Sequence, residues 1–182
     1  VRCRRLGAGA EGNISTLSLF ITQMTSILFI CTANQFRSVI AALYFAREVV
    51  RRGDDKNFSV GSAGTWAYPG SPATSTAIQI MEGYNLDLSF HKARLISSEI
   101  IGEADLILVM EEGHREGILL DYPEADGKIF LLTEAAGEPP VEIPDPYTTN
   151  APAEEVAHDI VRLLDESYEK IIAFGWKFAK ED

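Results

Sequence analysis

Cys31 and Arg37 are the residues of this chain whose types and spacing most clearly suggest chemistry. They lie six positions apart, directly after the apolar run 27–30, and Ser38 follows them. A loop between a buried strand and a helix start turns backbone N–H groups toward a concavity, and such a nest binds phosphate. Arg37 adds a planar fork of donors that fits two phosphoryl oxygens. Positive potential there favours the nucleophilic thiolate of Cys31. The pattern predicts attack on phosphorus, although Cys31 as a plain buried residue ending a strand is the alternative.

An attack of this kind needs a proton donor for the leaving oxygen, and Asp145 is the candidate. It lies between two prolines in the segment Ile143-Pro-Asp-Pro-Tyr147. Pro146 pushes Asp145 toward an extended backbone, and Pro144 stiffens the other side. A general acid benefits from such rigid presentation. Because Asp-Pro is also a common turn signal, this prediction depends on the pairing of Asp145 with the cysteine loop.

The elements that must position these residues alternate between strands and helices. Short apolar runs predict strands at 27–30, 58–60, 106–110 and 129–132. Apolar residues at helical spacing predict helices at 38–52, about 72–84, 112–120 and about 153–176, with Asn150 as the cap of the last. Residues 133–152 are rich in proline and predict a long irregular loop.

This order of elements predicts an α/β fold. We expect three layers, with a four-stranded parallel sheet and helices on both of its faces. Active sites of such sheets lie beyond the C-terminal strand ends, where the strand order reverses. The cysteine loop follows the first strand, so the predicted fold places it at such a point.

Length and charge limit the remaining possibilities. The 182 residues carry a net charge of −11, which argues against a general nucleic-acid binder. No apolar run approaches the length of a membrane span. Two cysteines, Cys3 and Cys31, cannot build a disulfide scaffold. With its unpaired reactive cysteine, the protein is expected in the cytoplasm.

The first 23 residues are unlike the rest of the chain. They hold an arginine cluster and a Gly/Ala run, and Met24 precedes a strong strand signal. We expect 1–23 to be an N-terminal extension upstream of a natural start at Met24, and 24–182 to form one domain. A genuine N-terminal arm with little order is the alternative.

Together these motifs resemble the low-molecular-weight protein tyrosine phosphatases. The family pattern C-x-G-N-x-C-R-S-P corresponds to Cys31–Val39, and its downstream D-P-(F/Y/W) corresponds to Asp145–Tyr147. Two further matches are Ser62-Ala-Gly64 and His91-Lys-Ala-Arg94. The resemblance covers about 26–176 and implies a flavodoxin-like strand order.

The resemblance also implies roles for individual residues. Cys31 would form a phosphocysteine intermediate, Arg37 would bind the phosphoryl group, and Asp145 would protonate the leaving group and then activate water. The residues expected to bind phosphate or support the loop are Thr32, Ala33, Asn34, Gln35, Phe36, Ser38, Ser62 and His91. Tyr147 and Trp66 would wall the substrate pocket.

The implied partners follow from the same resemblance. The substrate would be a phosphorylated protein or peptide, and inorganic phosphate would be a product. No metal, cofactor or nucleic acid is implied. We expect a monomer or a weak dimer.

Three positions depart from the family pattern. Ala33 replaces a usual glycine and would cost on the order of 1 kcal/mol if the backbone there had positive φ. Phe36 replaces a usual second cysteine, so the reversible disulfide that protects the nucleophile cannot form with this position. Cys31 should therefore oxidise more easily, unless Cys3 or a small thiol forms a disulfide with it. Val39 replaces a proline at the helix start.

Several alternatives remain open from the sequence. A threonine at position 32 resembles the bacterial members of the family that hydrolyse phosphoarginine. A protein-arginine phosphatase is therefore the second hypothesis. Arsenate reductases share the fold and the loop, but they pass a disulfide to further cysteines, and none follows Cys31. Phosphotransferase-system IIB subunits also carry a phosphocysteine at a strand end, but they need no pair equivalent to Arg37 and Asp145, so this hypothesis ranks low. A non-catalytic phosphate-binding protein is the remaining hypothesis, motivated by the altered loop.

Overall fold

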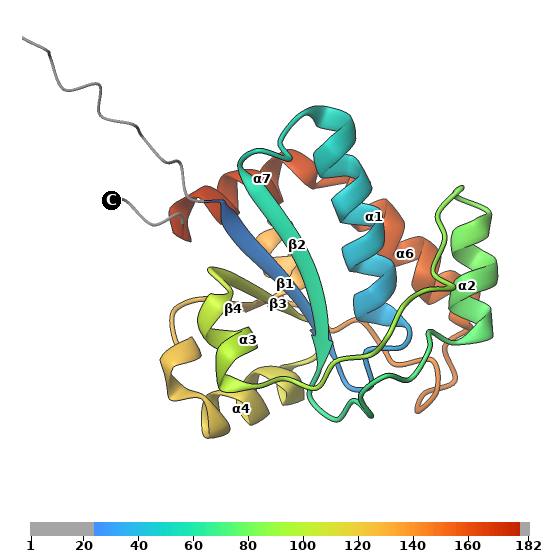
Figure 1. Cartoon of the computed structure of the whole chain (residues 1–182), viewed down its shortest axis with the longest axis horizontal. Helices are drawn as coiled ribbons and strands as arrows, with labels where there is room; N and C mark the ends of the chain where they lie inside the picture. The colour runs from blue at the N-terminus through green and yellow to red at the C-terminus, as the bar shows by residue number, and fades with distance from the viewer. Residues whose placement is uncertain (1–23, 179–182) are drawn as a thin grey trace, which may run out of the picture.

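Four parallel strands form the central sheet of this protein, whose computed structural model describes residues 24–178. The strands are β1 (Thr25–Cys31), β2 (Phe58–Gly64), β3 (Leu106–Val109) and β4 (Ile129–Leu131). They lie in the order β2-β1-β3-β4, and β1 pairs with both β2 and β3 (Figure 1). The strand order therefore reverses beside β1, and the predicted parallel sheet of flavodoxin-like order is confirmed. The expected extension 1–23 lies outside the described residues.

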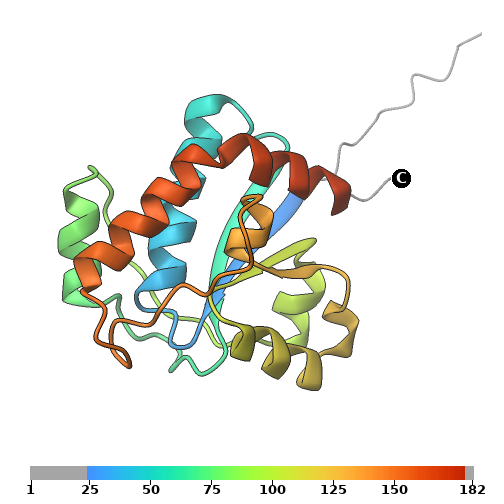
Figure 2. The same ribbon diagram turned by 180° about the vertical axis from the view of Figure 1, so that it is seen from behind.

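Helices cover both faces of this sheet (Figures 1 and 2). They are α1 (Arg37–Arg52), α2 (Ser75–Glu82), α3 (Ser98–Glu103), α4 (Glu112–Asp121), α5 (Leu132–Ala135), α6 (Ala153–Glu166) and α7 (Tyr168–Gly175), with 3₁₀ turns η1 (Pro123–Ala125) and η2 (Trp176–Phe178). No helix in the described part of the chain is long and apolar enough to cross a membrane.

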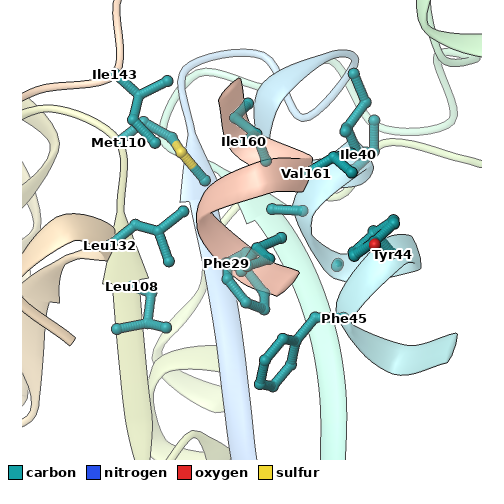
Figure 3. Packing of buried hydrophobic residues seen from close by; sticks show 14 of the residues in the cluster. Phe29, Ile40, Tyr44, Phe45, Leu108, Met110, Leu132, Ile143, Ile160 and Val161 are labelled. Atoms are coloured by element: carbon teal, nitrogen blue, oxygen red, sulfur yellow. The ribbon is translucent and has the colours of Figure 1, made fainter. Parts of the chain in front are cut away.

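Alternation along β1 divides the apolar core into two layers, because successive side chains of a strand point to opposite faces. Phe29 belongs to the larger layer, where it packs with residues of α1 and α6 such as Phe45 and Ile160 (Figure 3). Ile30 belongs to the smaller layer, with Ile101 of α3 and Ile118 of α4 among its members. Burial on both faces explains the continuous apolar run of β1.

A buried carboxylate fixes the C-terminal half of α1. Glu48 is 1% exposed and accepts hydrogen bonds from the side chains of Arg47, Arg51 and Arg52. Burial raises the pKa of Glu48, but these bonds outweigh it, and the net pKa is lowered. Gly53 then ends the helix with a left-handed φ of 83°, a conformation that glycine adopts at low cost.

The structure corrects several expected boundaries. β2 continues from Phe58 to Gly64, because β1 offers it a parallel partner along its whole length. The predicted loop 133–152 is irregular only after α5, whose four residues begin at Leu132. The expected final helix is two helices, α6 and α7, which meet at Ser167, and α6 is preceded by Pro152 rather than capped by Asn150. Helix α3 was not predicted.

Candidate active site

The cysteine loop leaves the C-terminal end of β1, next to the strand-order reversal, and enters α1. Cys31 is 3% exposed, and its Sγ lies 3.0 Å from Ser38 Oγ. Helix α1 follows the loop directly, and its N-cap residue Phe36 provides no side-chain acceptor. The first N–H groups of a helix have no intrahelical partner, so this terminus is suited to an anion. The expected placement of the loop at a strand-to-helix turn is confirmed.

Asn34 holds this loop in shape through four hydrogen bonds. Its backbone is left-handed, with φ of 54°, which asparagine tolerates better than most residues. The side-chain Nδ2 donates to Ser38 Oγ at 3.0 Å and to Ser62 Oγ at 2.9 Å. Its Oδ1 accepts the Arg94 backbone N–H at 2.9 Å, and its carbonyl accepts from His91 Nε2 at 2.8 Å. Because Ser38 accepts from Asn34, the Ser38 hydroxyl proton can be donated to Cys31 Sγ.

His91 is held as a neutral imidazole by this arrangement. Burial lowers its pKa, and the nearby Arg94 lowers it further, whereas the bond to the Asn34 carbonyl acts in the opposite direction. A carbonyl oxygen only accepts, so Nε2 carries the ring proton. The matched positions Ser62 and His91, distant in sequence, thus meet the loop at one residue, Asn34.

Gly64 lies against the backbone of the cysteine loop. A Cβ at this position would lie 2.5 Å from the Thr32 carbonyl oxygen and 2.9 Å from the Asn34 nitrogen. The next two residues bond the same loop, since Thr65 N donates to the Cys31 carbonyl and Trp66 N to the Thr32 carbonyl. Only a residue without a side chain allows β2 to approach this closely.

Two departures from the family pattern concern the backbone. Ala33 does not have positive φ; the left-handed residue is its neighbour Asn34, so the condition for strain at Ala33 is not met. Val39 lies inside α1, 1% exposed, and packs in the larger core layer.

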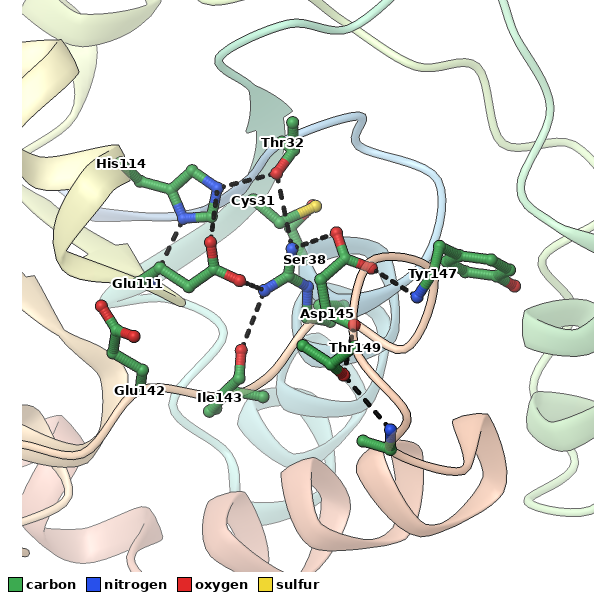
Figure 4. A network of polar contacts seen from close by, with 12 residues as sticks. Cys31, Thr32, Ser38, Glu111, His114, Glu142, Ile143, Asp145, Tyr147 and Thr149 are labelled. Carbon is green, nitrogen blue, oxygen red and sulfur yellow. Dashed lines mark hydrogen bonds and ion pairs between the residues drawn. The ribbon is translucent and has the colours of Figure 1, made fainter.

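Arg37 is 2% exposed and is bonded on both of its terminal nitrogens; Figure 4 labels its partners Glu111, Ile143 and Asp145. Nη1 donates to the Glu111 carboxylate and to the Ile143 carbonyl, the latter at 2.8 Å. Nη2 donates to Asp145 Oδ2 at 2.6 Å and, at 3.4 Å, to Thr32 Oγ1. The guanidinium therefore joins the cysteine loop to the segment that carries Asp145, and it lines the cavity with its terminal N–H groups bonded to these partners.

Asp145 is ordered by the turn that follows it. Its second carboxylate oxygen, Oδ1, accepts the Tyr147 backbone N–H at 2.9 Å. Its carbonyl accepts from both the backbone nitrogen and the hydroxyl of Thr149. The carboxylate is thus presented to Arg37 by a turn built on its own backbone.

These groups line one cavity of about 240 Å³. Its lining residues are Cys31, Thr32, Ala33, Gln35, Phe36, Arg37, Thr74, Asp145 and Tyr147. The Phe36 and Tyr147 rings meet edge to face, with centroids 5.6 Å apart, and form an apolar wall. Trp66 does not line this cavity, and its side chain is 85% exposed.

Glu111 and His114 are neighbours of the site that the sequence did not reveal. Both follow β3, which pairs with β1, and both reach the cysteine loop at the start of α4. His114 Nε2 lies 2.9 Å from Thr32 Oγ1, and the Glu111 backbone N–H donates to His114 Nδ1 at 3.2 Å. The only sequence signal was an acidic residue and a histidine three positions apart after a predicted strand. No cluster of possible metal ligands occurs among the described residues.

Comparison with known proteins identifies a family. Residues 26–178 match the family described as low molecular weight phosphotyrosine protein phosphatase. The chain is 32% identical over 151 residues to a probable low molecular weight protein-tyrosine-phosphatase, EpsP, of Ralstonia nicotianae, covering 82% of this chain and 98% of that protein.

Solved structures are similar as well. The low molecular weight protein tyrosine phosphatase from T. tengcongensis superposes with a TM-score of 0.72 at 33% identity, over 80% of this chain and 99% of that one. The YwlE arginine phosphatase from Geobacillus stearothermophilus gives a TM-score of 0.73 at 26% identity, over 87% and 99%.

Proposed function

This chain belongs to the low molecular weight phosphotyrosine protein phosphatase family and is thus a phosphatase, and from this premise we propose that it hydrolyses phosphotyrosine in proteins or peptides through a phosphocysteine intermediate. The observation that carries the proposal is the convergence of Cys31, Arg37 and Asp145 on one cavity. A nucleophile, a phosphate-binding fork and a proton donor are the groups this reaction requires.

In the first step, the Cys31 thiolate attacks phosphorus, so that an S–P bond forms and the P–O bond to tyrosine breaks. The Ser38 hydroxyl, 3.0 Å from Sγ, stabilises the thiolate by donating to it. Asp145, released from its ion pair with Arg37 and protonated, donates its proton to the departing phenolate oxygen. Tyrosine then leaves as a neutral phenol.

In the second step, water attacks phosphorus and the S–P bond breaks. Asp145, now a carboxylate, accepts the proton of the attacking water, and the Cys31 thiolate is regenerated as inorganic phosphate leaves. Arg37 and the loop N–H groups bind the equatorial oxygens in both steps, where charge accumulates in the transition state. Such preorganised donors act more strongly in a cavity that excludes water than in solution.

The cavity wall supports an aromatic leaving group. Phe36 and Tyr147 lie beside the catalytic groups, so a phenol ring attached to the phosphoryl group would rest against apolar surface. Tyr147 follows Asp145 by two residues, so one turn presents both the proton donor and the ring contact.

Protein phosphoarginine is the second candidate substrate. Similarity to a structure named an arginine phosphatase and the presence of Thr32 in the cavity favour it. The same three catalytic groups would serve, with a guanidinium nitrogen in place of the phenolic oxygen. Phosphotyrosine remains our proposal because the cavity offers an aromatic wall.

The proposal is tested by hydrolysis of a phosphotyrosine peptide and a phosphoarginine peptide of the same sequence in parallel. We expect faster release of phosphate from the phosphotyrosine peptide and no release from either peptide by Cys31→Ser. Faster hydrolysis of the phosphoarginine peptide would replace the proposal by the second candidate. Binding of phosphate without turnover of either peptide would favour a non-catalytic phosphate-binding protein.

A further inference from the structure

His114 is a buried polar side chain for which neither the motifs nor the three catalytic groups give a reason. It lies in the first turn of α4, 5% exposed, and faces the cysteine loop across the boundary between β3 and β1. Buried polar groups are stable only when they are hydrogen-bonded. Both ring nitrogens have partners, and these partners determine where the single proton of a neutral imidazole lies.

The tautomer of His114 follows from its hydrogen bonds. The Glu111 backbone N–H lies 3.2 Å from Nδ1, and a peptide N–H can only donate, so Nδ1 is unprotonated. The ring proton is therefore on Nε2, which lies 2.9 Å from Thr32 Oγ1 and donates to it.

The charges around His114 are compatible with a neutral ring. Burial lowers its pKa and Arg37 lowers it further, whereas Glu111, Asp145 and Glu142 act in the opposite direction. The pKa of His114 is lowered on balance.

This tautomer leaves the Thr32 hydroxyl as a donor. Oγ1 accepts a hydrogen bond from His114 (Figure 4). At a longer 3.4 Å it also accepts one from Arg37 Nη2, because a guanidinium nitrogen can only donate. Both contacts use the oxygen as an acceptor, so the hydroxyl proton is available to another group. Thr32 lines the cavity together with Cys31 and Asp145, where the phosphoryl group is expected.

We propose that His114 is a positioning residue that acts through Thr32, holding its hydroxyl so that the O–H donates to the phosphoryl group bound in the cavity. The inference rests on the proposed function for the identity of that group. Thr32 touches the substrate, whereas His114 acts only through Thr32.

Glu111 connects His114 to Arg37. Its carboxylate accepts from Arg37 and its backbone N–H donates to His114, so one residue fixes both the guanidinium and the imidazole. The turn that carries Glu111, which lies outside the family motif, therefore fixes the position of His114 relative to the cysteine loop.

Two substitutions of His114 separate its structural role from its effect on Thr32. Asparagine places an acceptor near the Nδ1 position for the Glu111 N–H but is too short to reach Thr32. Glutamine is longer, retains an acceptor suited to this helix position and offers an N–H to Thr32. We expect kcat/KM for the phosphotyrosine peptide to fall roughly three- to tenfold in His114→Asn, a typical loss for one hydrogen bond, and to recover largely in His114→Gln.

A double-mutant cycle with Thr32→Val provides the decisive comparison. If His114 acts through the Thr32 hydroxyl, His114→Asn changes kcat/KM less than about twofold in the Thr32→Val background. Equal losses in both backgrounds, full activity of His114→Asn, or a glutamine variant no better than the asparagine variant would each overturn the inference. Thermal unfolding of every variant identifies any that is not folded.

Binding of inorganic phosphate distinguishes failure of this inference from failure of the proposed function. We expect the phosphate Kd, measured by calorimetry, to rise roughly three- to tenfold in His114→Asn and to be unaffected by that change in the Thr32→Val background. If no peptide is hydrolysed but this pattern is found, the inference stands and the proposed function fails. An unchanged Kd, in a protein that does hydrolyse the peptide, overturns the inference alone.

Discussion

Gly64 offers the most direct test of how the cysteine loop is positioned. In Gly64→Ala, the new Cβ would lie 2.5 Å from the Thr32 carbonyl oxygen, whereas ordinary contact begins at 3.4 Å. The loop or the strand must therefore move by about 0.9 Å, because the opposing atoms are backbone and cannot rotate away. Forced overpacking of this kind costs about 1–3 kcal/mol of stability.

The same displacement has a larger effect on catalysis. In the proposed mechanism the N–H groups of the loop bind the phosphoryl oxygens, and a misplacement of about 1 Å in a catalytic constellation can cost on the order of 10²-fold in rate. We therefore expect kcat/KM of Gly64→Ala to fall about 100-fold on a phosphotyrosine peptide. The unfolding midpoint should fall as well, with the protein still folded at 25 °C.

Gly61→Ala is the matched control on the same strand. Its Cβ would meet the end of the flexible Arg94 side chain at 3.2 Å and no backbone atom of the cysteine loop. We expect its kcat/KM to stay within about twofold of the unmodified protein. A folded Gly64→Ala protein with unchanged kcat/KM would refute the reasoning, as would an equal loss in Gly61→Ala.

Three further predictions concern groups described above. In Asp145→Asn, kcat on a phosphotyrosine peptide should fall about 10²–10⁴-fold, and much less on an activated ester whose leaving group needs no proton; equal losses on both would contradict general acid catalysis. Glu48→Gln should lower the free energy of unfolding by about 1–3 kcal/mol, measured by urea denaturation, because the bonds from three arginines lose their charged acceptor; an unchanged urea midpoint would contradict this. His91 and His114 both have pKa values lowered below 6.5 in the folded protein. As the pH falls through 6.5, these histidines therefore take up protons in the unfolded chain before they do so in the folded protein. The free energy of unfolding should decrease until the pH has passed the folded pKa values. The melting temperature between about pH 5.5 and 7.5 should depend less on pH in the double variant His91→Asn with His114→Gln than in the unmodified protein. An identical pH dependence would argue against these pKa shifts.

The fold could be predicted from the sequence wherever burial leaves a continuous signal. The strands β1 and β3 are buried on both faces and stand out as apolar runs, and α1 has an apolar stripe that ends at Gly53. Helix α3 was missed because its six residues are too few to show a period, with Ser97 as the only local signal. The break between α6 and α7 at Ser167 was missed because the apolar spacing continues across it.

The candidate site divides in the same way. Cys31, Arg37 and Asp145 belong to local motifs, so their types and neighbours predicted their convergence in the cavity. Glu111 and His114 reach the loop only because β3 pairs with β1, a contact between segments about 80 residues apart. In sequence they look like the solvated acidic start of a helix. No local sequence pattern distinguishes a solvated helix start from two residues that bond Arg37 and Thr32.

The position of Arg37 ties together two parts of the site that are usually considered separately. It bonds both the carbonyl of Ile143 and the carboxylate of Asp145, so its loss would remove two contacts of the proposed proton-donor segment as well as the proposed phosphate-binding fork. Loss of Asp145 would in turn leave Nη2 of a buried guanidinium without its nearest anion. Substitutions at these two positions should therefore be strongly epistatic, with the double variant little worse than either single one. A lineage drifting away from catalysis would be expected to lose both residues in close succession, because the second confers little benefit once the first has changed.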